Sequence, residues 1–198
     1  MSPEAKSKAL EIVLEYAKAF LQAAILAAVI IVFIAQSHLV DGVSMENTLH
    51  DRERLMVDKL SYRFIEPKRG EIIVFRFPQD PRSRFVKRVI GIPGDTVEIR
   101  NGVVYLNDVP LDEPYIKEPP RDNMPKVTVR PDHVFVMGDN RNNSLDSRHP
   151  PVGQVPYNLI VGRALFSYWP PSAIKWLSIP DTFDQFVGED ASDKAAGG

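Results

Sequence analysis

The sequence predicts a mainly β protein, in which an antiparallel β-sheet body follows one N-terminal transmembrane helix. Short runs of β-branched and aromatic residues alternate with charge, Gly and Pro, and the chain holds 17 prolines among 198 residues. This composition favours strands and loops over helices. The dipeptide Asn101-Gly102 separates two such runs and is typical of a two-residue β-hairpin. The one long apolar run, residues 19–36, lies near the N-terminus.

Residues 1–18 are predicted to form a cytoplasmic amphipathic helix, and residues 19–36 a membrane anchor. Apolar side chains recur at helical spacing in the first segment: Leu10, Val13, Leu14 and Ala17. In the second, Gln22 is the only polar side chain before Gln36, and a helix of this length, about 26 Å, nearly spans a bilayer core. Lysines precede the run, and no Lys or Arg follows it until Arg52. The positive-inside rule therefore places the N-terminus in the cytoplasm.

Two other interpretations of the apolar run stay open. A buried core helix would rarely be apolar on every face. A cleavable signal peptide would end at Ala35-Gln36-Ser37, where small residues occupy the two positions that such cleavage requires. Acidic residues before the run argue against cleavage, so a permanent anchor is the preferred interpretation. Residues 37–180 would then form the body, on the outer face of the membrane.

The body is predicted to consist of short strands. In residues 84–92, Phe85, Lys87 and Val89 share one face, so Lys87 lies on a largely apolar face. The expected strands are residues 55–57, 72–77, 84–92, 96–100, 103–107, 127–130, 133–137 and 160–168.

Three further segments are interpreted from composition. Residues 96–132 are predicted to be a reduced insertion, a hairpin followed by a long loop rich in Pro and charge. The aromatic and apolar residues of 169–177 are expected to cap the core, with a patch at the membrane interface as the alternative. Residues 181–198 are acidic, then small and polar, and are predicted to be a disordered tail.

Composition excludes several kinds of site. A net charge of −2 indicates no basic face for nucleic acid. The absence of cysteine excludes disulfides, thiolate catalysis and cysteine-ligated zinc. The polar run 138–148 lacks the alternating acidic ligands and central Gly of a calcium loop. We therefore expect no nucleic-acid partner, no metal and no organic cofactor.

Ser44, in VDGVSMENTL, is a candidate nucleophile, and Lys87, in FVKRVIGIPGD, is a candidate general base. A serine hydroxyl needs a base to take its proton. A lysine is a base only when neutral, and its ordinary pKa near 10.4 leaves under about 1% neutral at pH 7. Burial can lower that pKa by about 3 to 5 units. Phe85 and Val89 are the neighbours able to provide the apolar surroundings. A loop serine and a snorkelling surface lysine are the ordinary alternatives.

The polar run GDNRNNSLDSR, residues 138–148, contains residues able to aim the lysine. Ser144 can exchange a hydrogen bond with the lysine amine, and Asp146 and Arg148 can pair and hold Ser144 in place. The alternative is an Asn-rich turn whose side chains satisfy their own backbone. A Ser-His-Asp triad also stays open, because triads assemble in space, although no acid lies at a useful spacing from His38, His50, His133 or His149.

Four blocks, DGVSMENTL, RGEIIVF, FVKRVIGIPGD and VMGDNRNNSLDSR, occur in this order. With them the chain resembles the type I signal peptidases of bacteria, membrane-anchored serine proteases that remove signal peptides from exported preproteins. The resemblance covers roughly residues 19–170, and the third and fourth blocks are its most specific parts. It implies a Ser-Lys dyad of Ser44 and Lys87, an acyl-enzyme, and no cofactor.

The resemblance implies further roles and partners. Ser144 would orient the lysine, Asp146 and Arg148 would support the loop, and the Ser44 backbone N–H would serve the oxyanion hole. The substrate would bind as an added β-strand, and its expected partners are preprotein signal peptides and a phospholipid membrane. The location implied is the cytoplasmic (inner) membrane, crossed once. Shallow pockets that select Ala-x-Ala would be lined by Val40, Met45, Phe85 and Val86.

The chain departs from the family pattern at two positions. Asn47 stands where many members have Pro, and Gly42 stands where some have a serine that donates a second oxyanion hydrogen bond. Gly42 is therefore a doubtful oxyanion residue, and a backbone amide or water would replace it. The alternatives are a Ser-Lys processing peptidase of a pilus or conjugation system, a self-cleaving repressor, and a non-catalytic anchored β module that binds exported chains.

Overall fold

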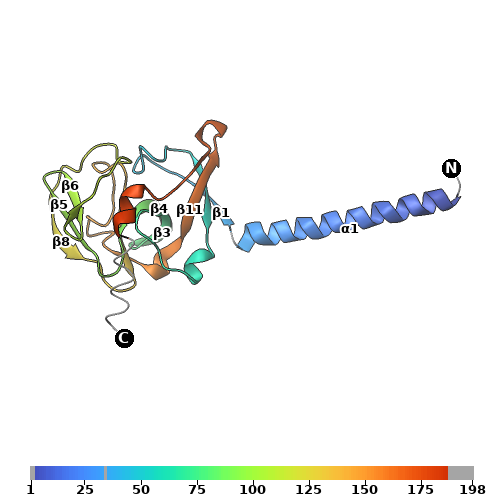
Figure 1. The fold of residues 1–198 in the computed structure, drawn as a ribbon, viewed down its shortest axis with the longest axis horizontal. Helices are drawn as coiled ribbons and strands as arrows, with labels where there is room; N and C mark the ends of the chain where they lie inside the picture. The colour runs from blue at the N-terminus through green and yellow to red at the C-terminus, as the bar shows by residue number, and fades with distance from the viewer. Residues whose placement is uncertain (1–2, 34, 187–198) are drawn as a thin grey trace.

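Helix α1 (Pro3–Phe33) projects from the β-rich body and is followed by β1 (Ala35–Leu39) (Figure 1). The computed structural model describes residues 3–33 and 35–186. Within those two ranges, no helix combines the length and the hydropathy that a membrane crossing requires. The crossing predicted for residues 19–36 stays a prediction. The helix ends before the predicted boundary, because Ala35 and Gln36 already pair with strand β2 (Arg54–Asp58).

The larger sheet has the strand order β1-β2-β11-β3-β4-β9-β10, with β12 beside β11, and all neighbours are antiparallel. Its other strands are β3 (Ile72–Phe77), β4 (Asp80–Gly91), β9 (His133–Met137), β10 (Val155–Pro156), β11 (Ile160–Trp169) and β12 (Lys175–Trp176). The strands predicted in these ranges are confirmed. Short 3-10 helices connect them: η1 (Ser61–Arg63), η2 (Tyr157–Leu159) and η3 (Pro171–Ala173). Because each neighbour reverses direction, β1 and β4 run the same way.

A second sheet is formed by the segment predicted as a hairpin and loop. Its order is β7-β6-β5-β8, with bounds β5 (Thr96–Arg100), β6 (Val103–Leu106), β7 (Val109–Pro110) and β8 (Met124–Thr128). The predicted hairpin turn is confirmed, since Asn101 and Gly102 both have positive φ, as a type I′ turn requires. The prediction of a mere hairpin and loop is wrong. Residues Met124–Thr128 pair with β5, and Val97, Ile99, Val104 and Leu106 form a buried core.

The C-terminal segment completes that core. Asp181–Phe186 forms the 3-10 helix η4, and Phe183 and Phe186 are buried in the same cluster as the second sheet. The Arg69 guanidinium donates to the Phe186 carbonyl at 3.1 Å. The prediction of a disordered tail from residue 181 is therefore wrong for η4, because its two Phe side chains bury apolar surface. Residues 187–198 lie outside the described residues.

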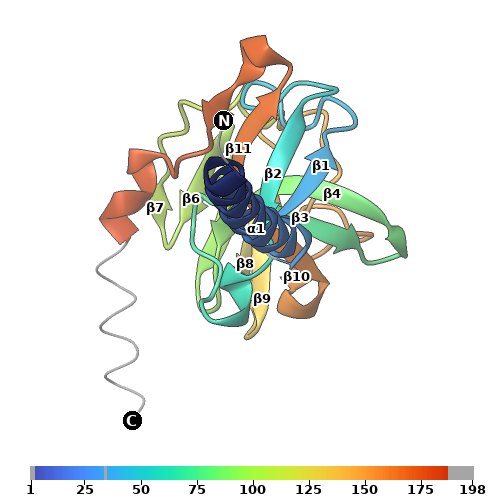
Figure 2. The ribbon, with the colours of Figure 1, turned by 90° about the vertical axis from the view of Figure 1, so that its right-hand side faces the viewer.

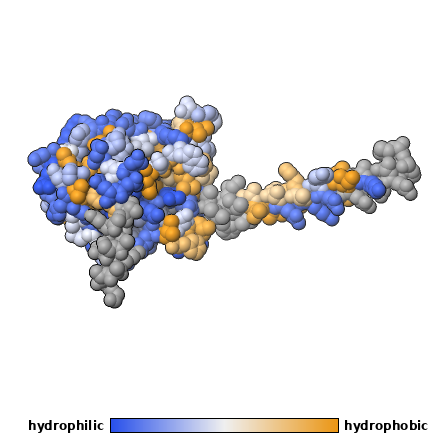
Figure 3. Space-filling model, viewed as in Figure 1, coloured by the Kyte–Doolittle hydropathy of each residue, from blue (hydrophilic) through white to orange (hydrophobic). Residues whose placement is uncertain are grey.

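Most of the hairpin between β11 and β12 does not cap the core. Trp169, Ile174 and Trp176 are 53%, 65% and 78% exposed, so the predicted cap is wrong for these three side chains, although Leu177 packs against the core. The alternative, a patch at the membrane interface, stays a prediction. Figures 1 and 2 place this hairpin at the side of the body from which α1 leaves. Figure 3 shows apolar surface on the same side of the body.

Candidate active site

Ser44 lies in the loop that joins β1 to β2, and the core holds this loop in place. Met45 and Leu49 are buried in the cluster beneath it. The Leu49 N–H donates to the Met45 carbonyl at 2.8 Å, and the Val40 N–H donates to the Glu53 carbonyl at 2.8 Å. With its neighbours fixed by burial and backbone hydrogen bonds, Ser44 is presented half-buried at the surface of the loop.

Lys87 lies on β4, and its amine meets the Ser44 hydroxyl. The side chain is buried, with 4% exposed, and Nζ lies 2.7 Å from Ser44 Oγ and 2.9 Å from the Val86 carbonyl oxygen. The Phe85 ring centroid is 5.3 Å from Nζ. Burial lowers the pKa of Lys87 to about 8, against the opposing charges of Asp146 and Asp139. A substantial neutral fraction is therefore available to accept a proton near neutral pH.

The polar run 138–148 packs beside this pair, as predicted. Arg148 makes a two-pronged ion pair with Asp146, at 2.8 Å for both contacts, and the Gly138 N–H donates to Asp146 at 3.0 Å. Burial alone would raise the pKa of Asp146, but the hydrogen bond and charge of Arg148 outweigh it and the pKa is lowered. Asp146 is thus held ionised inside the loop, and the predicted Asp146–Arg148 pair is present.

Ser144 does not make the predicted hydrogen bond to Lys87. Within the described residues its buried Oγ has no hydrogen-bond partner at normal geometry, although it lies near enough to Asp146 to help lower that pKa. Ser144 Oγ instead faces Gly138, where an added Cβ would lie 2.3 Å from it and 2.5 Å from the Ser44 carbonyl oxygen. Only a glycine allows the two serine segments to approach this closely.

The loop also contacts the nucleophile directly, through residues that sequence reasoning missed. Asn140 donates from its backbone N–H to the Ser44 carbonyl at 3.1 Å and from Nδ2 to the Val43 carbonyl at 3.0 Å. Asp139 pairs with Arg88 at 2.9 and 2.7 Å, and both side chains are buried. In the alternative interpretation the Asn-rich turn satisfies its own backbone, but Asn140 instead bonds to the loop that carries Ser44. The alternation along β4 puts Arg88 on the face opposite to Lys87. This was the sequence signal that could have indicated a buried partner for Arg88.

Gly42 does not supply the second oxyanion donor. It has no side chain, and its N–H is already bonded to Asp51 at 2.8 Å. By contrast, no residue in the described ranges accepts a hydrogen bond from the Ser44 N–H. That N–H is free to receive a developing oxyanion. Ser44 has no histidine partner in the described part of the chain either, so the Ser-Lys arrangement is favoured over a triad.

A shallow cleft of about 160 Å³ opens beside Ser44 and Lys87. All four residues predicted to bind substrate line it: Val40, Met45, Phe85 and Val86. Sequence reasoning missed the other lining residues: Leu39, Asp41, Arg84 and Leu145. Both walls end at the reactive pair, since β1 leads through Val40 to Ser44 and β4 leads through Val86 to Lys87. The cleft therefore presents an apolar surface directly beside the nucleophile.

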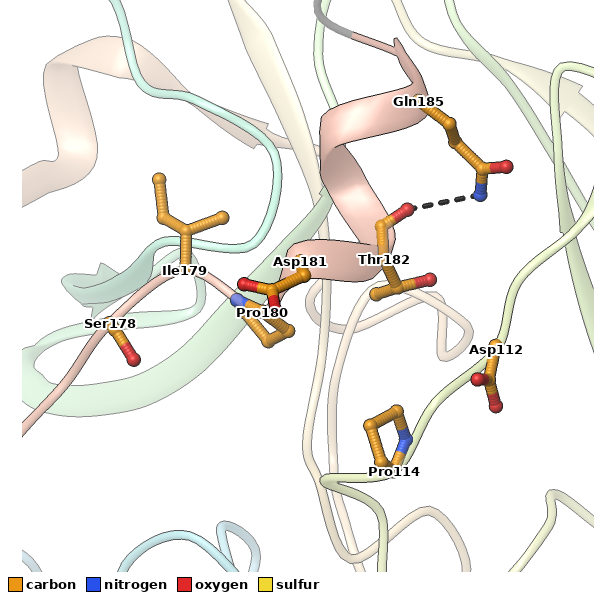
Figure 4. A pocket seen from close by; sticks show the side chains of 8 residues that line it. All are labelled: Asp112, Pro114, Ser178, Ile179, Pro180, Asp181, Thr182 and Gln185. Carbon is orange, nitrogen blue, oxygen red and sulfur yellow. Dashed lines mark hydrogen bonds between the residues drawn. The ribbon is translucent and has the colours of Figure 1, made fainter.

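A larger hollow of about 630 Å³ lies elsewhere, between η4 and the loop that follows β7 (Figure 4). Its floor includes Thr182, whose carbonyl accepts a hydrogen bond from Gln185 at 3.0 Å. It is lined by Asp112, Pro114, Ser178, Ile179, Pro180, Asp181, Thr182 and Gln185, with no lysine or histidine to act as base. The smaller cleft, and not this hollow, has the nucleophile and base of a reactive site.

Comparison with known proteins identifies the family of the chain. Residues 13–169 match the family described as signal peptidase, peptidase S26. A probable signal peptidase I-1 of Synechocystis sp. is 46% identical over 157 residues, covering 76% of this chain and 79% of the relative. The signal peptidase I of Leptolyngbya laminosa is 41% identical over 158 residues, covering 76% and 77%. A signal peptidase I of Bacillus amyloliquefaciens is 38% identical over 184 residues, covering 88% of this chain and 97% of the relative. The chain belongs to the signal peptidase family, peptidase S26.

Proposed function

We propose that this chain is a serine endopeptidase that removes N-terminal signal peptides from exported preproteins, with Ser44 as nucleophile and Lys87 as general base. The observation that carries the proposal is the 2.7 Å separation of Lys87 Nζ and Ser44 Oγ at a buried position. Burial lowers the pKa of Lys87, which supplies the neutral amine that a serine nucleophile requires. Membership of the signal peptidase family supports the reaction class.

The reaction proceeds in two stages. Ser44 Oγ attacks the carbonyl carbon of the scissile bond and passes its proton to Lys87 Nζ, while the Ser44 N–H binds the oxyanion. The protonated Lys87 then gives this proton to the departing amine, which leaves the signal peptide joined to Ser44 as an ester. In the second stage Lys87 takes a proton from water, which attacks the ester. The signal peptide leaves and Ser44 regains its proton.

The cleft supports a preference for small side chains before the scissile bond. Its volume is only about 160 Å³, so it accommodates small side chains such as Ala better than large ones. The peptide would add to β4, where β9 pairs only with Arg88–Gly91 and leaves the earlier edge of β4 open. Open backbone groups and shallow apolar pockets are the features of recognition by strand addition.

The location proposed is a single crossing of the cytoplasmic membrane, with the N-terminus inside and the catalytic body on the outer face. Residues 19–33 of α1 carry no charged side chain. Two segments with exposed apolar side chains lie on the side of the body from which α1 leaves, and Figure 2 shows the course of their backbone. One is the β11–β12 hairpin with Trp169 and Trp176, and the other follows η1 and contains Phe64 and Ile65. Exposed Trp at this level is typical of a membrane interface.

Cleavage of a preprotein by the full chain in detergent tests the proposal. Ser44→Ala and Lys87→Ala are each expected to abolish cleavage while the circular dichroism spectrum is unchanged. Exposed residues of the same types, Ser172→Ala and Lys126→Ala, are the matched controls and should cleave at the wild-type rate. Near-normal turnover by either folded dyad variant would show that the assignment is wrong.

The specificity is tested on the substrate. Replacing the small residue just before the scissile bond by Phe is expected to stop cleavage, because the shallow cleft has no room for an aromatic ring. Efficient cleavage of the Phe substrate at the same bond would contradict the proposed pockets. Ala and Ser at this position are the positive controls.

A further inference from the structure

Arg84 is a charged residue in a cleft that otherwise fits small apolar side chains. We propose that Arg84 gives the enzyme a charge preference at the fourth residue before the scissile bond, where it disfavours Lys and Arg and favours Asp and Glu. The inference rests on the proposed function and narrows its substrate class. It concerns the flank of the cleavage region, and not the small residues next to the bond.

The guanidinium of Arg84 has no carboxylate to neutralise it. The side chain is exposed and lines the cleft, and no residue in the described ranges forms an ion pair with it. Its cross-strand neighbour on β3 is Arg76, so two like charges face each other, an unfavourable arrangement in a sheet. The nearby Asp80 accepts hydrogen bonds from the Arg82 N–H and from Ser83 Oγ. The cleft wall therefore keeps a net positive charge.

The direction of the strands gives the position that Arg84 faces. The apolar lining of both walls, Val40 on one and Phe85 and Val86 on the other, precedes Ser44 and Lys87 in the chain. The part of the substrate before the scissile bond, which ends in small residues, must therefore lie along the earlier part of β1 and β4. A strand and an extended peptide rise equally, about 3.3 Å per residue. Arg84, three residues before Lys87, then lies opposite the fourth residue before the bond.

The charge of Arg84 also reaches β1, the strand that leads into the opposite wall of the cleft. His38, on β1, has a pKa lowered first by burial and then by the Arg84 charge, so it is neutral at neutral pH and adds no positive charge. Asp41 and Lys87 are the other charged residues that line the cleft, and Lys87 lies beside Ser44. Residues 42 and 43, between Asp41 and Ser44, are bent and not extended, so Asp41 faces positions nearer the scissile bond than Arg84 does. At the distal position Arg84 is the dominant charge.

Three peptides test the inference. They share one cleavage region ending in Ala-x-Ala and carry Lys, Ala or Glu at the fourth residue before the bond. Two unit charges about 5 Å apart in a water-exposed cleft change a rate by about fivefold. For the wild-type full chain in a zwitterionic detergent, kcat/KM is expected to be about fivefold lower with Lys than with Ala and about fivefold higher with Glu than with Ala, so that Lys and Glu differ by about 25-fold. The difference should shrink in 1 M salt, because exposed charges are screened.

Substitutions locate the effect. Arg84→Lys should retain the preference, Arg84→Ala should remove it, and Arg84→Glu should reverse the order of the Lys and Glu peptides. Arg100→Glu, on the second sheet, changes net charge equally and should leave the ratio as in the wild type. A Lys-to-Glu ratio that is unchanged by Arg84→Glu, or absent in the wild type, would overturn the inference. If the wild type cleaves none of the peptides, including the Ala peptide, the proposed function itself fails.

Discussion

The rate of cleavage should follow the titration of Lys87. With a pKa of about 8, the neutral fraction is roughly 10% at pH 7, 50% at pH 8 and 90% at pH 9. We expect kcat/KM on a small-residue peptide to rise about tenfold between pH 7 and pH 9 and then to level off. A lysine with its ordinary pKa of 10.5 would instead give a rise of about 100-fold over the same interval and no plateau before pH 10.

The same shift of pKa makes a prediction about stability. The lowered pKa means that the unfolded chain binds more protons than the folded chain between about pH 8 and pH 10.5. Stability from this group is therefore lost at low pH and regained as pH rises through that window. At pH 7 the cost is about 3 kcal/mol, of which the hydrogen bond to Ser44 offsets about 1 kcal/mol.

Lys87→Met removes the charge and keeps the apolar stem. It should raise the free energy of unfolding by about 2 kcal/mol at pH 7, and the gain should vanish near pH 10.5 while cleavage is abolished. Urea unfolding at pH 7 and pH 10.5 measures both values, with Ser44→Ala as an inactive control that shows no such gain. A rate midpoint above pH 9.5, or a Met variant less stable than the wild type at pH 7, would refute the buried-base explanation.

Three other substitutions test the supporting structure. Gly138→Ala places a Cβ within 2.5 Å of the Ser44 carbonyl oxygen. The resulting displacement of Ser44 should lower kcat by on the order of 100-fold without loss of circular dichroism signal. A variant with the wild-type kcat would contradict this prediction. Asp146→Asn removes a charge that raises the pKa of Lys87, so the midpoint of the rate profile should move to lower pH. A shift to higher pH would contradict this reasoning. The variant should also lose about 3 to 5 kcal/mol of stability, because Arg148 loses its partner. Phe183→Ala should lower the free energy of unfolding in urea by about 3 to 5 kcal/mol. Asp184→Ala, at the exposed neighbouring residue, serves as the control. Equal stability of the two variants would mean that η4 is not part of the core.

Much of the site was predictable from the sequence because the reactive residues lie in short contiguous segments. Alternation along β4 placed Lys87 beside Phe85, and the proximity of Asp146 to Arg148 predicted their pair. Pairing between distant segments left no such local signal. The strand that completes the second sheet, β8, follows a long Pro-rich loop, and η4 buries its Phe residues against strands some 80 residues earlier in the chain. The sequence predicted a strand at residues 127–130, which overlaps β8, but not its pairing with β5. Composition described residues 181–186 as part of a polar tail and so missed η4.

The loop of residues 138–148 sets the distance between nucleophile and base because it binds to the segments that carry both. Asn140 bonds to the Ser44 segment, and Asp139 pairs with Arg88, the residue next to Lys87 on β4. The charges of the same loop also oppose the lowering of the Lys87 pKa by burial. A change in this loop therefore acts on the position and on the basicity of the lysine together. For this reason, a substitution in the loop is expected to alter both kcat and its pH dependence.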